Sequence, residues 1–82
     1  MYALLNFVNQ TAYPVISVEE DGRTVIADLL RGEPSPYHAF SAGSVCLIVK
    51  QNTQKPFLNM LVPLALCSRQ TLVIEDAAAH FS

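Results

Sequence analysis

One segment limits the possible folds of this chain more than any other. Val45–Val49 is five apolar residues in a row, with Lys50 directly after it. A strand that is apolar on both faces is typical of the centre of a sheet covered on both sides. Alternate side chains of a strand point to opposite faces, so the odd-numbered residues would share one face and Cys46 and Ile48 the other. A chain of 82 residues supplies only one thin core. The second face must therefore be covered by the C-terminal tail or by another subunit.

Short strand signals recur along the rest of the chain about every eight to twelve residues, whereas no window keeps apolar residues at helical spacing. The strongest turn signal is Asp21-Gly22, because glycine adopts the positive φ that a tight hairpin turn requires. The strands on either side of this turn should pair directly. The expected strands are Leu4–Asn9, Tyr13–Glu20, Arg23–Ala27, Tyr37–Phe40, Ser44–Lys50, Phe57–Val62 and Gln70–Glu75.

Seven short strands without a clear helix predict an all-β fold, a small antiparallel immunoglobulin-like β-sandwich. We expect Val25 and Ala27 to point into its core and Asp28–Pro36 to form a loop that crosses between the sheets. A single domain would span 1–76. A tail would follow at 77–82, where three alanines could add one helical turn.

The composition excludes several classes of function. Charged residues make up 15% of the chain, below the usual share of about 25%, so a charge-poor surface that favours self-association or a protein partner is expected. The net charge is −2 and the five basic residues are scattered, which argues against nucleic-acid binding.

The N-terminus lacks the features of a signal peptide. No transmembrane segment is expected either, because the uncharged stretch Pro56–Ser68 is too short and is interrupted by Pro63. As written, the chain would be cytoplasmic.

No metal or cofactor site is expected. His38 and His80 are the two histidines, and neither belongs to a ligand-spacing motif. We expect His38 on the exposed face of a short strand. Cys46 and Cys67 would remain thiols, with Cys46 acting as a small buried apolar residue.

Catalytic residues are also not expected. Ser35, His38 and Asp28 could converge near the crossing loop, but no G-x-S-x-G sequence supports a nucleophile there. Gly32–Pro36 could instead shape a ligand-binding loop. Several aromatic residues could form either a binding platform or core and edge packing, with Tyr37 expected at the edge of the core; they are Tyr2, Tyr13, Tyr37, Phe40 and Phe57.

The first fifty residues also resemble a known family. The elements that carry the resemblance are Val8-Asn9, Pro14, Asp21-Gly22, Gly32 with Ser35 and Tyr37, Ala42-Gly43, and Val45–Val49. Over residues 4–50 this pattern is similar to the bacterial domain of unknown function 4397. The resemblance implies an immunoglobulin-type sandwich, a possible location at the cell surface and no catalytic residues.

The sequence therefore predicts a non-enzymatic β-sandwich module for self-association or protein–protein interaction, as a homodimer or with a protein partner. The alternative, which the resemblance implies, is a small cell-envelope or carbohydrate-binding domain. A small hydrolase that uses the Asp28–His38 loop is a third hypothesis.

Overall fold

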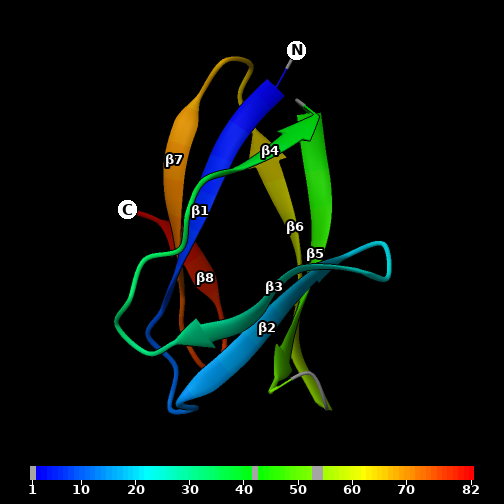
Figure 1. Ribbon diagram of the computed structural model, residues 1–82. Helices are drawn as coiled ribbons and strands as arrows, with labels where there is room; N and C mark the ends of the chain where they lie inside the picture. The colour runs from blue at the N-terminus through cyan, green and yellow to red at the C-terminus, as the bar shows by residue number, and fades with distance from the viewer. Residues whose placement is uncertain (1, 42, 53–54) are drawn as a thin grey trace.

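The computed structural model describes residues 2–41, 43–52 and 55–82, and within them the chain forms eight strands and no helix (Figure 1). The strands make two four-stranded sheets that pack face to face, in the orders β4-β1-β7-β8 and β3-β2-β5-β6. The predicted all-β sandwich is confirmed, with eight strands where about seven were expected. The strands are β1 Tyr2–Asn9, β2 Val15–Glu20, β3 Arg23–Leu30, β4 His38–Ser41, β5 Gly43–Gln51, β6 Lys55–Leu64, β7 Arg69–Ile74 and β8 Ala79–Phe81.

One strand pair departs from the expected antiparallel arrangement. β1 runs parallel to β7, in a register that extends from Leu4 opposite Arg69 to Asn9 opposite Ile74, and antiparallel to β4. The chain reaches β7 only after the other sheet is complete, so β7 joins β1 by a long-range pairing that no local turn signal in the sequence could indicate.

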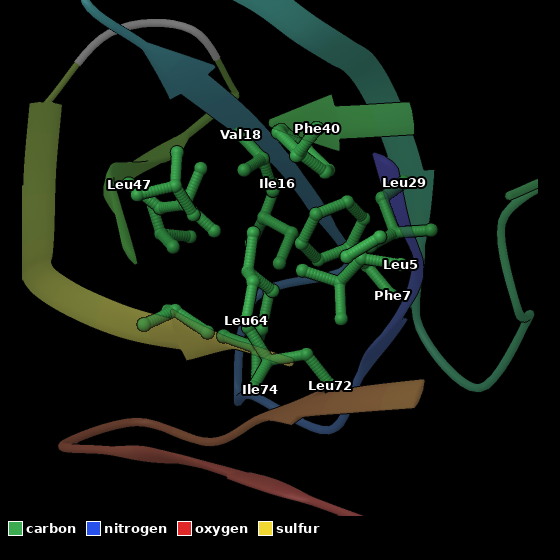
Figure 2. Close-up of a cluster of buried hydrophobic side chains, with 14 residues drawn as sticks. Leu5, Phe7, Ile16, Val18, Leu29, Phe40, Leu47, Leu64, Leu72 and Ile74 are labelled. Carbon is green, nitrogen blue, oxygen red and sulfur yellow. The ribbon is translucent and has the colours of Figure 1, made fainter. Parts of the chain in front are cut away.

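β5 lies in the middle of its sheet, between β2 and β6, as the apolar run predicted. Its odd-numbered residues point into the sandwich, and Leu47 and Val49 are completely buried. They meet Leu5 and Phe7 of β1 and the other side chains of a core that fills the space between the sheets (Figure 2). This arrangement confirms the expected inner face of β5.

The turn between β2 and β3 is the expected tight hairpin. Asp21 and Gly22 have φ angles of 50° and 79°, which is the pattern of a type I′ turn. β3 then contains two register shifts relative to β2, at which extra residues are inserted. Because of these bulges Ala27 is exposed, and Ile26 and Leu29 are the residues opposite the buried Val18 and Ile16.

A buried asparagine fixes the connection from β1 to β2. The Asn9 amide nitrogen donates to the backbone oxygens of Tyr13 and Leu29, each at 3.1 Å. Its Oδ1 accepts from the backbone nitrogen of Thr11 at 2.9 Å and from the Thr11 hydroxyl at 2.6 Å. Asn9 thus holds residues 11–14 in an irregular turn, and β2 begins at Val15 instead of Tyr13.

The crossing loop after β3 is tied to β1. The backbone nitrogen of Ser35 donates to the oxygen of Phe7 at 2.8 Å, and the Ser35 hydroxyl accepts from the nitrogen of Phe7 at 2.9 Å. The Asn6 amide donates to the Ser35 oxygen at 3.3 Å, and its Oδ1 accepts from the hydroxyl of Thr71 at 2.6 Å. The loop therefore extends the edge of β1 before β4 begins.

The C-terminal residues form a strand, and the helical turn expected at 77–79 is wrong. β8 pairs antiparallel with β7, with Phe81 opposite Leu72 and Ala79 opposite Ile74. Half-buried Ala79 and Phe81 alternate with exposed His80, which is the period of a strand. The described part of the chain contains no helix of the length and hydrophobicity that a membrane crossing requires.

Candidate interaction surface

The outer face of β5 and β6 carries a group of uncharged side chains, which we call the β5–β6 patch. It consists of three cross-strand pairs: Ser44 opposite Pro63, Cys46 opposite Leu61, and Ile48 opposite Asn59. These residues point outward because their neighbours Val45, Leu47, Val49, Val62 and Leu64 belong to the core.

The patch is open to solvent within one chain. Leu61 is 67% exposed, Cys46 is exposed, and Ile48 is half-buried. Of the two covers considered for this face, the C-terminal tail is the wrong one, because β8 joins the other sheet. The expectation that Cys46 is buried is also wrong, since no segment of the described chain lies over it. An exposed leucine on a regular sheet position is the feature that sequence reasoning missed, although the alternation from Leu58 to Val62 indicates it.

An ion pair lies at one end of the patch. Lys50 Nζ is 3.0 Å from Glu19 Oε2, and both side chains are largely covered. Glu19 is opposite Ile48 in the sheet. A shallow hollow of about 390 Å³ lies between the ion pair and Phe57, with Pro56 and Asn59 on its wall. The charges that border the patch are therefore already neutralised by each other.

The outer strands of this sheet are β3 and β6. Of these two, β6 carries Pro56 and Pro63, which have no backbone N–H. Proline on an edge strand limits the pairing of a further strand, because it removes a hydrogen-bond donor from the ladder. At β6, the face of the sheet is accordingly more open to a partner than the edge.

The residues considered for catalysis are used for structure or lie apart. Ser35 is buried and bound to the backbone of β1. Asp28 is exposed on β3. His38 is half-buried with its ring centroid 6.3 Å from that of Phe7, so the expectation of an exposed face is wrong. Its Nε2 is enclosed, without a hydrogen-bond partner in the described part of the chain. No hydrogen bond joins any two of these three residues, all of which the structure describes.

A hollow of about 300 Å³ lies at the opening between β3 and β4, lined by His38 with Glu20 and Arg23. Arg23 and Glu20 approach each other to 3.8 Å there. Because the His38 Nε2 is enclosed by protein atoms, that nitrogen does not face this hollow as a free ligand or base.

Metal-ligating side chains do not gather in the part of the chain that the structure describes, where no group of three or more His, Cys, Asp or Glu could hold an ion. Cys46 and Cys67 are both exposed and are thiols. His80 is exposed on β8, with its Nδ1 3.9 Å from Glu75 Oε2.

The aromatic residues do not form a row. Tyr13 packs on Phe57 with ring centroids 4.9 Å apart, and Phe40 is buried in the core. Tyr37 is exposed instead of packed at the core edge, and the Arg69 guanidinium lies 5.5 Å above its ring centroid. Because Arg69 covers one face of the Tyr37 ring, that face is not open to stack on a sugar. Tyr2 is exposed on β1.

A second opening of the sandwich lies between β6 and β8. A groove of about 330 Å³ is lined there by apolar and polar residues of the two edges, among them Met60, Asn59, His80 and Phe81. It is bounded by the short strand β8 on one side and by the proline-bearing strand β6 on the other.

Comparison with known proteins returned no match, whether to a protein-family model, to a curated protein or to a solved structure.

Proposed function

We propose that this protein is a non-enzymatic β-sandwich module whose function is to associate with a second copy of itself. The observation that supports the proposal is the β5–β6 patch, six outward-facing residues without a charge on a central strand and its neighbour. Contiguous apolar patches larger than a few hundred Å² are rare on monomeric soluble proteins and mark interaction sites, and exposed Leu61 and Cys46 lie at the centre of this patch.

The size of the chain favours the same function. A domain of 82 residues hides a smaller share of its surface than a larger one. Burial of an exposed leucine side chain contributes about 1.5–3 kcal/mol, so contact of Leu61 with a partner would be a substantial gain for so small a domain. Charged residues, which are costly to desolvate, stand only at the border of the patch.

Light scattering after size exclusion tests the proposal over a series of protein concentrations. The mass should rise from the 9.0 kDa of one chain toward twice that value as concentration increases. Leu61→Arg should keep the mass at 9.0 kDa at every concentration, because it places a charge in the centre of the patch.

Leu66→Arg is the matched control. Leu66 is also an exposed leucine, at 55%, but it lies in the turn after β6 and outside the patch. This variant should associate as the unmodified chain does. A chain that stays monomeric at millimolar concentration, or equal dissociation of both variants, would contradict the proposal.

A further inference from the structure

The connection from β1 to β2 begins with a modification sequence that the proposed function does not use. Asn9-Gln10-Thr11 is an N-x-T triplet without proline in its middle position, and this is the sequence to which asparagine-linked oligosaccharides are attached. We propose that Asn9 accepts such an oligosaccharide only while the chain is unfolded, because the folded domain encloses its side chain. This inference does not depend on self-association.

The chemistry of attachment requires access to one atom. The Asn9 amide nitrogen Nδ2 forms a bond to C1 of a sugar and loses one of its two hydrogens as a proton. The bond between C1 and the pyrophosphate of a lipid-linked oligosaccharide breaks, and the lipid pyrophosphate leaves with the electron pair. The transferring enzyme, an oligosaccharyltransferase, must therefore receive the extended asparagine side chain in its own site.

The folded domain uses both hydrogens of that nitrogen. Asn9 Nδ2 donates to the backbone oxygens of Tyr13 and Leu29, each at 3.1 Å, and Asn9 has no exposed surface. A sugar on Nδ2 would have to displace one of these acceptors. Because glycosylated asparagines lie in surface loops, the folded domain presents this triplet in a form that a transferase cannot use.

The third residue of the triplet is enclosed as well. The Thr11 hydroxyl donates to Asn9 Oδ1 at 2.6 Å and accepts from the backbone nitrogen of Tyr13 at 3.1 Å. Only 3% of Thr11 is exposed. The two residues that define the modification sequence thus bond to each other inside the turn, and neither side chain is presented to solvent.

The backbone on both sides of the triplet is tied to distant parts of the fold. The backbone nitrogen of Gln10 donates to the oxygen of Ile74 at the end of β7, at 2.8 Å. The backbone nitrogen of Gly32, in the loop after β3, donates to the oxygen of Asn9 at 2.9 Å. Release of the triplet breaks contacts with both sheets, so Asn9 should become accessible only when the whole domain unfolds.

The population of unfolded chain then sets the rate of modification. Folding is about 10³- to 10⁸-fold faster than unfolding for typical small domains, so the unfolded fraction is about 10⁻³ or less. The folded chain should consequently be glycosylated at Asn9 at least about 10³-fold more slowly than an unfolded chain that carries the same triplet.

A purified oligosaccharyltransferase that accepts N-x-T, supplied with its lipid-linked oligosaccharide, tests this inference. The substrates are the full chain and its Leu47→Asp variant, in which a charge at a completely buried position should prevent folding. Circular dichroism verifies that the first is folded and the second unfolded. Mass spectrometry should then locate the oligosaccharide on Asn9 of the variant and leave the folded chain unmodified over the same time.

Two further variants are the controls. Thr11→Ala, added to the Leu47→Asp chain, removes the modification sequence and should abolish the reaction. Leu66→Asn with Ser68→Thr, made in the chain that folds, creates a second N-x-T in the exposed turn after β6. That turn should be glycosylated while Asn9 of the same molecule stays unmodified, which verifies that the enzyme acts on the folded domain.

The outcomes are distinct. Modification of Asn9 in the unfolded chain but not in the folded chain supports the inference. Glycosylation of Asn9 in the folded chain at the rate of the exposed turn overturns it, because the side chain would then be reached without unfolding. An unfolded Leu47→Asp chain that is not glycosylated at Asn9 also overturns it, since the triplet would then not be an acceptor.

Discussion

Replacement of Leu47 by alanine tests the placement of β5 at the centre of the sandwich. Leu47 is completely buried, and Figure 2 shows its side chain among those of the core. Truncation of a buried leucine costs about 2–5 kcal/mol, the sum of lost burial and the cavity that remains. The whole domain should have a free energy of unfolding of about 4–12 kcal/mol, from about 0.05–0.15 kcal/mol for each of its 82 residues. Leu47→Ala should therefore remove a large part of the total.

Leu61→Ala is the control for this prediction, because it makes the same chemical change on the outer face of the sheet. Leu61 lies on the strand next to Leu47 but points to the opposite side of the sheet, where it is 67% exposed. An exposed substitution of this kind changes stability by about 0.5 kcal/mol or less. The same chemical change on two neighbouring strands should therefore have very different effects.

Thermal unfolding followed by circular dichroism, at a concentration low enough to keep the chain monomeric, measures both variants. A loss of 1 kcal/mol lowers the Tm of a domain of this size by about 4–8 °C. A cost of about 3 kcal/mol for Leu47→Ala corresponds to a decrease of about 12–24 °C, whereas Leu61→Ala should lower the Tm by at most about 4 °C. Equal decreases for the two variants would refute the assignment of inner and outer faces.

Two further substitutions test the turns. Gly22→Val should cost about 1–3 kcal/mol, because a β-branched residue is strained at a φ of 79° even though its Cβ would meet no other atom within 4 Å; an unchanged Tm would contradict the type I′ turn. Asn9→Ala should cost at least about 2 kcal/mol in urea unfolding, because it leaves the buried backbone oxygen of Leu29 without this donor and removes the acceptor of the Thr11 backbone nitrogen. Its exposed neighbour serves as the control, and Gln10→Ala should change stability by less than about 0.5 kcal/mol.

Local patterns were sufficient to predict much of the fold. Alternation identified the inner face of β5, and the Asp21-Gly22 pair identified the hairpin, because both depend on residues close together in the sequence. The parallel pairing of β1 with β7 depends on residues more than sixty positions apart, and no short pattern encodes it. The bulges in β3 likewise arise from its fit to β2, so the exposed position of Ala27 could not be predicted by simple alternation.

The structural roles of buried polar residues were the other feature that the sequence did not predict. Asn9 has no distinctive neighbours in the sequence, yet its side chain makes four hydrogen bonds that shape the β1–β2 turn. Ser35 was considered for catalysis, whereas its hydroxyl is bound to the backbone of β1. A serine or asparagine with a structural role looks the same in a single sequence as one in an active site. The difference becomes visible only when the partners of its polar atoms are known.

The position of the candidate surface follows from two charge-free runs that the fold brings together. Residues 34–49 and 56–68 contain no Asp, Glu, Lys or Arg. The first run includes most of β5 and the second most of β6, and these strands pair along nearly their whole length. Each run alone supplies an inner face to the core, but only their pairing produces a continuous uncharged outer face. The uncharged residues of the two runs are thus gathered on one surface of the sheet. Leu61→Arg places a charge at the centre of that surface.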